Sequence, residues 1–344
     1  MIDFQHWPET SGFLQFLKRT EPSLNDIAST PFEVLDEVGA IHLRKYHSTA
    51  KDHRWPVLIL PSIINRPFVL DLLPEKSFIL NLLENGHDVY MIDWGIPQSH
   101  EQYLSFEKLM TLHLEYLLQK VEMDCGGAKV HLMGHCLGGT IGLMASLMNP
   151  QRFASLTLIT TPIRFSDNDK LSLWARCPDF DLQAFTEAYG NVPWFLLQST
   201  FLALKPTQVF QKYRQLLGKL KDPRFVRNFW AMESWANDNV DLRGECFKVL
   251  LGELYQKNAL EKGPMRIGKK TIDLRQHELP TFVLIADADH IVSPLSHLTA
   301  EMVPNVKNLK VVNSEGGHVG ALIGGRSVKT IWPQLNNWMK TCEV

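Results

Sequence analysis

The segment VHLMGHCLGG, residues 130–139, decides how this sequence folds. It passes from an apolar strand pattern through Gly134, Cys136 and Gly138 into a helical pattern. In a nucleophile elbow, a reactive side chain lies on a sharp strand-to-helix turn, and its neighbours are glycines because a Cβ would clash there. We therefore predict that Cys136 is a nucleophile. The helix that begins at Leu137 is expected to favour the thiolate, which is the reactive form.

The elbow also predicts where an oxyanion would be stabilised. One donor is expected to be the backbone N–H of Leu137, and the second an N–H of loop 61–65, near Ser62 or Ile63. A lone cysteine would instead be interpreted as a small buried hydrophobic residue. The glycines on both sides of Cys136, and its place between strand and helix, favour the elbow.

Strand and helix patterns alternate on both sides of the elbow. Apolar strand patterns occur at 38–46, 55–64, 88–94, 129–133, 156–160, 281–285 and 309–312. Helical spacing of apolar residues occurs at 75–84, 105–121 and 137–148. This alternation predicts βα units and a mostly parallel sheet with helices on both faces. Together with the elbow it predicts the α/β-hydrolase fold.

The alternation is interrupted once, which predicts the domain organisation. We expect 36–165 and 276–344 to form the catalytic core, 166–275 to form a helical cap inserted into it, and 1–35 to be an N-terminal extension with a short helical piece at 13–17. The insertion contains four tryptophans, and the simplest interpretation of each one is core packing. The functional interpretation is that the whole insertion is a lid over a pocket, lined by some of these rings. The four tryptophans are Trp174, Trp194, Trp230 and Trp235.

An elbow needs an acid and a histidine, which follow the nucleophile in that order along the chain. The strand pattern TFVLI leads into a loop with Asp287 and Asp289, and the pattern LKVV leads to His318. His318 is the candidate base. Spacing does not separate the two aspartates as the orienting acid. His290 lies on the acid loop and therefore ranks below His318.

Composition excludes several classes of protein. Lys plus Arg total 35 and Asp plus Glu total 37, a net charge of −2 that argues against a nucleic-acid-binding protein. Neither a secretory signal nor 18 consecutive apolar residues is visible, so we expect a cytoplasmic protein without a transmembrane helix. The five cysteines form no CxxC pair, and HExxH is absent. We therefore expect no disulfide framework, no metal and no cofactor.

Several segments resemble the polyhydroxyalkanoate synthases, most closely the short, class III type of catalytic subunit. The resemblance extends over roughly residues 35–340, and nothing before it is recognised. It rests on NRPFVLDLLPEKSF (65–78), DWG (93–95), GHCLGG (134–139), WANDNVDLRGECF (235–247), LYQKNAL (254–260), ADADHIVSP (286–294) and GGHVGAL (316–322).

The resemblance implies roles for three residues. Cys136 matches the catalytic cysteine of the family, Asp289 in the pattern D-H-x-V matches its aspartate, and His318 in G-G-H matches its histidine. This favours Asp289 over Asp287. The implied activity is polymerisation of (R)-3-hydroxyacyl-CoA, with 3-hydroxybutyryl-CoA as the expected substrate, through an acyl-cysteine intermediate and with release of CoA. The resemblance also implies a homodimer, an accessory subunit and a location at the surface of polyester granules.

Two other classes of protein remain possible from the residues alone. A cysteine hydrolase, such as a thioesterase, lactone hydrolase or polymer depolymerase, would use the same triad with water as acceptor. A non-catalytic binding protein of the same fold would need no triad, so the ordered Cys, Asp and His argue against it.

Overall fold

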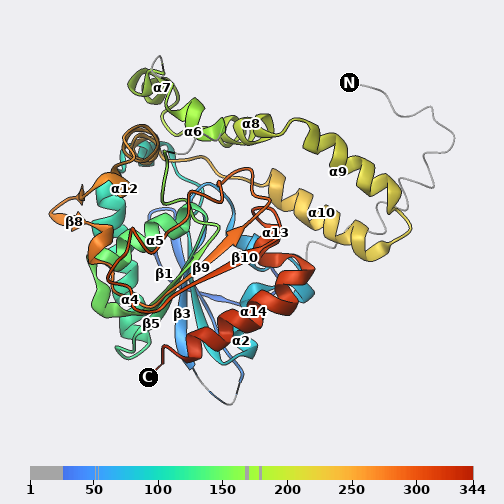
Figure 1. Ribbon diagram of the computed structural model, residues 1–344, viewed down its shortest axis with the longest axis horizontal. Coiled ribbons are helices and arrows are strands. Elements are labelled where there is room, and N and C mark those ends of the chain that lie inside the picture. Colours follow the sequence, from blue (N-terminus) through green and yellow to red (C-terminus); the bar gives the residue numbers. More distant parts are fainter. Residues whose placement is uncertain (1–25, 51, 53, 167–169, 178–179, 344) are drawn as a thin grey trace.

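A central sheet organises the protein, whose computed structural model describes residues 26–343 except 51, 53, 167–169 and 178–179 (Figure 1). The helical piece expected at 13–17 lies outside these residues. Eight strands lie in the order β1-β2-β4-β3-β5-β6-β9-β10. They are β1 (Glu33–Val38), β2 (Ile41–Tyr46), β3 (Arg54–Leu60), β4 (His87–Asp93), β5 (Val130–His135), β6 (Phe153–Ile159), β9 (Thr281–Ala286) and β10 (Leu309–Ser314).

From β4 to β10 all neighbouring strands run parallel, whereas β2 pairs antiparallel with both β1 and β4. The predicted mostly parallel sheet is therefore confirmed. After β3 the chain crosses to β4 on one side and then returns to β5 on the other. In open α/β sheets, ligands bind at the carboxyl ends of strands where the direction of winding reverses in this way.

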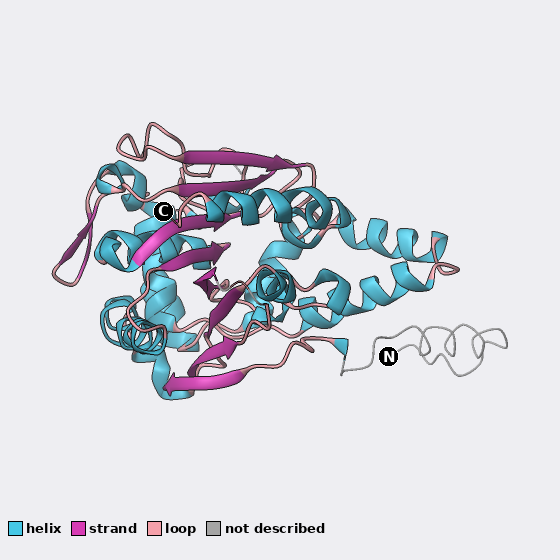
Figure 2. Ribbon diagram, turned by 90° about the horizontal axis from the view of Figure 1, so that it is seen from below, coloured by secondary structure: helices cyan, strands magenta, loops and turns pink. Residues whose placement is uncertain are grey.

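Helices cover both faces of the sheet (Figures 1 and 2). One face carries α2 (Phe78–Glu84), α13 (Gly320–Ile323) and α14 (Gly325–Lys340), and the other carries α3 (Phe106–Lys108), the π-helical turn η5 (Leu109–Leu114), α4 (Glu115–Asp124) and α5 (Leu137–Met148). Within β3, Val57 and Ile59 pack into the core on the face that carries α2 and α14. Leu58 and Leu60 pack into the core on the face that carries α4 and α5. The unbroken apolar run of β3 therefore reflects burial on both faces.

The elements between β6 and β9 are mostly helical, and in Figure 1 α6, α7 and α8 lie across the top of the sheet while α9 and α10 extend away as a pair. They are α6 (Lys170–Ala175), α7 (Leu182–Tyr189), α8 (Trp194–Leu204), α9 (Thr207–Gly218), α10 (Pro223–Asn237), α11 (Gly244–Lys248), η7 (Val249–Gln256), α12 (Ala259–Lys262), β7 (Met265–Ile267) and β8 (Lys270–Ile272). The domain boundaries at 165 and 276 stay predictions.

Short 3₁₀ turns complete the fold. They are η2 (Pro67–Leu70), η3 (Pro74–Lys76), η4 (Ser99–Tyr103), η6 (Pro150–Arg152) and η8 (Leu274–Gln276). Among the helices described, none has the length and apolar character that crossing a membrane requires.

The prediction of one strand over residues 38–46 is wrong. The pattern at 38–46 folds as the end of β1, a tight turn and β2, with Val38 paired to Ile41. Gly39 makes the turn at a φ of 60°, a conformation that glycine adopts without steric cost. Both strands are apolar on one face, so the alternation of apolar and polar residues continues across the turn. For that reason the sequence pattern did not show the turn.

Candidate active site

Cys136 occupies the turn between β5 and α5. Its φ of 54° and ψ of −131° are unusual for a residue with a side chain, and such strain persists only where the surroundings enforce it. The Cys136 N–H donates to the carbonyl of Ile159 at 2.9 Å, and the Gly139 N–H donates to the carbonyl of Cys136 at 2.9 Å. The strand–turn–helix geometry expected from the sequence is therefore present.

The flanking glycines are required by close packing. A Cβ on Gly134 would lie 2.3 Å from the Cα of Gly139, and one on Gly138 would lie 2.1 Å from the carbonyl oxygen of Leu60. Both contacts are to backbone, which cannot move aside as a flexible side chain could. The loop that follows β3 therefore lies directly against the elbow.

The predicted acid and base meet at the same edge of the sheet. Nδ1 of His318 donates to Oδ2 of Asp289 at 2.6 Å. The other carboxylate oxygen of Asp289 accepts from the N–H groups of Ile291 at 2.8 Å and Val292 at 3.0 Å. Cys136 lies close enough to His318 to act on the charge of its ring. Since Nδ1 is used by Asp289, Nε2 is the ring nitrogen that remains for the sulfur.

The second aspartate of the loop has a different environment. Asp287 is exposed, and its Oδ1 accepts from Nδ2 of Asn313 at 2.6 Å. Asp289 is buried and holds the imidazole of His318. Tertiary structure thus separates two residues that sequence spacing left equivalent, and it pairs the acid with His318 instead of His290.

Burial and neighbouring charges determine the protonation of His318 and Asp289. The exposed fractions of Cys136, His318 and Asp289 are only 6%, 8% and 9%. Burial alone would lower the pKa of His318, but the neighbouring Cys136 and the hydrogen bond to Asp289 raise it to about 10. Burial alone would raise the pKa of the Asp289 carboxyl, but His318 and the two backbone N–H groups hold it below its usual value. At neutral pH, His318 is therefore an imidazolium that contacts the Asp289 carboxylate.

This assignment gives a direct test on the imidazole. In Cys136→Ala the pKa of His318 should fall below about 10, because the neighbouring sulfur that favours the charged ring is removed. A pH titration of the ¹⁵N-labelled histidine rings by NMR measures it. Cys246→Ala is the matched control, since Cys246 is equally buried but lies in α11. An unchanged His318 titration in Cys136→Ala would contradict the proximity of sulfur and imidazole.

His135 lies beside the imidazolium, although sequence reasoning assigned it no role. The ring centroids of His135 and His318 are 5.5 Å apart. Burial, and then the charge on His318, lower the pKa of His135 to about 3, so this ring stays neutral. Its position directly before the nucleophile is the signal that could have drawn attention to it.

The oxyanion donors stay predictions. Leu137 is the first residue of α5, where backbone N–H groups have no partner within the helix. Ile63 is buried in the loop after β3, which packs against the elbow as Gly138 shows.

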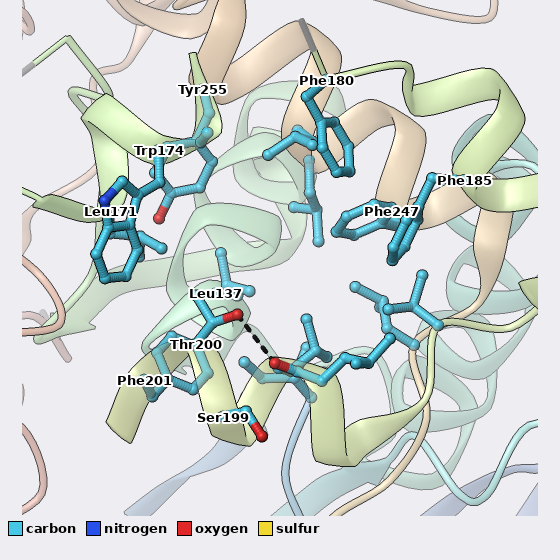
Figure 3. Close-up of a pocket in the computed structure, with 18 of the residues that line it drawn as sticks. Leu137, Leu171, Trp174, Phe180, Phe185, Ser199, Thr200, Phe201, Phe247 and Tyr255 are labelled. Atoms are coloured by element: carbon cyan, nitrogen blue, oxygen red, sulfur yellow. Dashed lines mark hydrogen bonds between the residues drawn. The ribbon is translucent and has the colours of Figure 1, made fainter. Parts of the chain in front are cut away.

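An apolar cavity of about 610 Å³ adjoins the elbow (Figure 3). Leu137 and Ile64 line it from the core, and aromatic side chains of the insertion line the rest: Trp174, Phe180, Phe185, Phe201, Phe247 and Tyr255. The hydroxyl of Thr200 at its wall is already used, because it donates to the carbonyl of Leu196 at 2.9 Å. The cavity therefore offers mainly apolar contacts.

The four tryptophans of the insertion have separate environments. Trp174 lines the cavity, whereas Trp230 packs edge-on against Phe229 in a small separate core. Trp194 packs edge-on against Phe195. The indole of Trp235 donates to the carbonyl of Arg66 at 2.9 Å. The interpretation as a cavity wall therefore applies to one of the four.

Other motif residues attach the insertion to the core. Nδ2 of Asn65 donates to Oδ1 of Asn239 at 2.6 Å. The buried guanidinium of Arg243 donates to the carbonyl of Trp94 at 3.2 Å and to Glu101 at 3.3 Å. The segments 65–78, 93–95 and 235–247 thus hold the cavity wall above the elbow.

Comparison with known families agrees with this arrangement. A family model described as the alpha/beta hydrolase fold matches residues 56–324. A second, described as the N-terminus of poly-beta-hydroxybutyrate polymerase (PhaC), matches residues 24–82. The predicted α/β-hydrolase fold is confirmed, and the similarity begins at residue 24, about ten residues earlier than the sequence motifs indicated.

Curated relatives carry the name poly(3-hydroxyalkanoate) polymerase subunit PhaC. The protein from Thiocystis violacea is 32% identical over 91% of this chain and 89% of its own length. That from Allochromatium vinosum is 33% identical over 83% and 80%. The haloarchaeal protein from Haloferax mediterranei is 32% identical over 91% of this chain, which spans only 64% of that longer relative.

Solved structures with this fold are more distant in sequence. A thioesterase domain from the curacin biosynthetic pathway superposes with a TM-score of 0.52 at 14% identity and covers 88% of this chain and 99% of its own. A meta-cleavage product hydrolase from Pseudomonas fluorescens gives 0.52 at 13% identity, with 90% and 97% covered. These two comparisons show the fold alone.

Proposed function

This chain belongs to the family of poly(3-hydroxyalkanoate) polymerases, and from that premise we propose that it polymerises (R)-3-hydroxyacyl-CoA and releases CoA. The observation that carries the proposal is the hydrogen bond between Asp289 and His318, buried next to Cys136 and beside an apolar cavity. The expected substrate is 3-hydroxybutyryl-CoA. In this proposal Cys136 is the nucleophile, His318 the general acid and base, and Asp289 the residue that orients the ring.

The first half of the reaction transfers the acyl group to Cys136. The thiolate attacks the thioester carbonyl, and the backbone N–H groups of Leu137 and Ile63 stabilise the oxyanion. The C–S bond to CoA then breaks, and the CoA sulfur takes the proton of the His318 imidazolium. The raised pKa of His318 supports this order, because the ring carries that proton before substrate arrives.

The second half forms the polymer bond. His318, now neutral, accepts the proton of a 3-hydroxyl group whose oxygen attacks the acyl-cysteine carbonyl. An oxygen ester forms, and Cys136 leaves as a thiolate. Because the first step exchanges one thioester for another, the acyl group stays activated, and the step to the ester is downhill. Asp289 stabilises the imidazolium in both halves.

Polymer forms only if water does not take the place of the 3-hydroxyl. The low exposure of the triad and the apolar lining of the cavity support exclusion of water. In this proposal residues 166–275 are the lid, and the cavity under them holds the acyl or polyester chain. Since Leu137 lines the cavity and directly follows Cys136, an acyl group there would lie next to the sulfur.

The same family membership motivates proposals about partners and location. We propose a homodimer, an accessory subunit of the class III type and attachment to polyester granules. Large apolar side chains are exposed along α6 to α9 and are suited to such a surface: Leu173, Trp174, Tyr189, Phe195, Leu202, Phe210, Tyr213 and Leu217. Co-sedimentation with polyester particles, compared between the native chain and a Phe210→Ser, Leu217→Ser variant, tests the attachment.

The activity itself is tested with (R)-3-hydroxybutyryl-CoA, with and without a candidate accessory subunit. We expect CoA release together with insoluble polyester, and neither in Cys136→Ala. Free 3-hydroxybutyrate without polymer would identify a hydrolase instead. Binding of substrate without any turnover, under both conditions, would favour a non-catalytic protein.

A further inference from the structure

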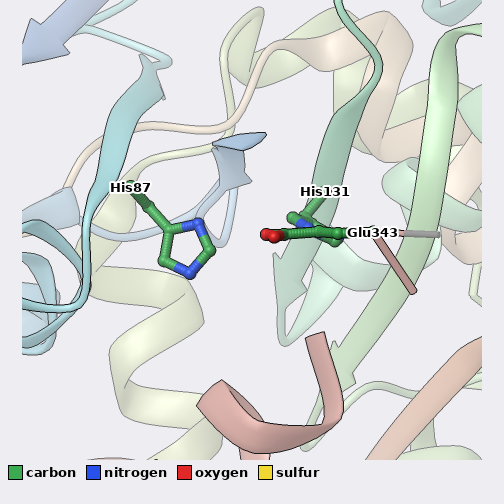
Figure 4. A group of neighbouring side chains, drawn as sticks. All are labelled: His87, His131 and Glu343. Atoms are coloured by element: carbon green, nitrogen blue, oxygen red, sulfur yellow. The ribbon is translucent and has the colours of Figure 1, made fainter. Parts of the chain in front are cut away.

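Two histidines and a glutamate meet at the edge of the sheet opposite the elbow (Figure 4). His87 is the first residue of β4, His131 lies near the start of β5, and Glu343 follows α14. Both rings are fully buried, and the Glu343 side chain is 9% exposed. One possible ligand atom from each residue lies within 4.8 Å of the other two.

One nitrogen in this group has no protein partner within the described part of the chain. Nδ1 of His87 hydrogen-bonds the carbonyl oxygen of Trp55 at 2.6 Å, and a carbonyl only accepts, so Nδ1 carries the proton. Nε2 of His87 then offers a lone pair, is buried and makes no hydrogen bond there. The His87 ring faces His131 and Glu343 in Figure 4. A buried polar atom without a partner requires an explanation.

The other two residues are already arranged as ligands. Nε2 of His131 lies 3.3 Å from Oε1 of Glu343, and its Nδ1 lies 2.8 Å from the hydroxyl of Ser155. Metal-binding histidines characteristically use their second ring nitrogen in this way, with a carbonyl or another polar group that fixes the orientation of the ring. Trp55 and Ser155 provide that contact for the two rings.

We propose that His87, His131 and Glu343 bind a divalent transition-metal ion of the zinc type, with water in the remaining position. Two imidazoles and one carboxylate are a donor set that Zn²⁺ accepts, at bond lengths of about 2.0–2.2 Å. Such bonds place tetrahedral ligand atoms roughly 3.3–3.5 Å apart. The separation of 3.3 Å between His131 and Glu343 already fits. The His87 ring would need to approach by up to about 1.5 Å.

A purely structural interpretation explains less. The His131–Glu343 contact, with Arg54 at 3.5 Å from the other carboxylate oxygen, would by itself attach the end of the chain to the sheet. It gives no partner to Nε2 of His87. An ion would satisfy that nitrogen and join β4, β5 and the segment after α14. Because the site lies at the opposite edge from Cys136, its expected effect is on stability.

The test measures metal binding by the full chain carrying Cys136→Ala, which removes the active-site sulfur as a competing ligand. After treatment with EDTA, zinc is titrated calorimetrically and cobalt by its visible absorption. We expect one ion per chain and a higher melting temperature with zinc. Glu343→Gln and His87→Gln should each weaken zinc binding by roughly 100-fold or more. Circular dichroism verifies that both variants are folded.

The matched control is His47→Gln. His47 forms a similar pair with Glu33, at 2.8 Å, but both side chains are exposed and no third ligand is placed there among the described residues. This variant should bind zinc like the parent. The proposal is overturned if the parent binds no stoichiometric zinc, or if Glu343→Gln and His87→Gln retain the affinity of the parent.

Discussion

Substituting Cys136 by serine is expected to reduce polymer synthesis by roughly 10³-fold or more. Two physical reasons combine. A serine hydroxyl is a weaker nucleophile than a cysteine sulfur, so the attack on the thioester slows. Any acyl group that does transfer becomes an oxygen ester, from which formation of the next ester bond is no longer downhill.

Initial rates of CoA release and the yield of polyester measure this effect, and mass spectrometry of the intact protein shows whether an acyl group accumulates on the serine. Cys125→Ser is the control, because Cys125 is half-buried after α4, away from the elbow. Its activity should match that of the native chain. Polyester made at a near-native rate by Cys136→Ser would refute the thioester mechanism.

The second largest effect is expected from Asp289→Asn, which should lower CoA release by roughly 10²- to 10⁴-fold. The amide cannot stabilise the imidazolium, and it no longer fixes the proton on Nδ1 of His318. Asp287→Asn is the matched control on the same loop, since the Asp287 side chain is exposed and its carboxylate accepts from Asn313 instead of His318. Equal losses in both variants would point to damage of the loop instead of a lost charge.

The pH dependence gives a second measure of Asp289. The imidazolium must be present to protonate the CoA sulfur, so native activity should fall as the pH rises through about 10, the pKa of His318. The hydrogen bond and charge of Asp289 help to raise that pKa. In Asp289→Asn the basic limb of the profile should therefore move to lower pH. Without such a shift, Asp289 would not be the partner that holds the charged ring.

The same pKa has a consequence for folding. Because it is raised above the usual value of 6.5, protonation of His318 stabilises the folded state fully below about pH 6.5, and that contribution disappears as the pH rises through about 10. The free energy of unfolding of Cys136→Ala should accordingly depend less steeply on pH in this interval than that of the native chain.

The elbow and the parallel strands were predictable because their signals are local. Gly134, Cys136 and Gly138 lie within five residues, and the apolar runs report directly that a strand is buried on both faces. The order of nucleophile, acid and histidine follows from the order of the strands along the chain. Most of β1 was not predicted, and the turn at Gly39 was overlooked because the apolar alternation continues across it.

Contacts between distant segments were decided by tertiary structure. Residues alone did not separate Asp287 from Asp289, and nothing local connects His87 and His131 with Glu343 or Arg243 with Trp94. The reason is geometric. Periodicity and turn residues encode backbone conformation and burial, whereas the choice of partner depends on which strands become neighbours, in which register, and on how the insertion lies above their ends. The sequence by itself thus determined which chemistry the chain carries, and the assembled sheet determined which atoms meet to perform it.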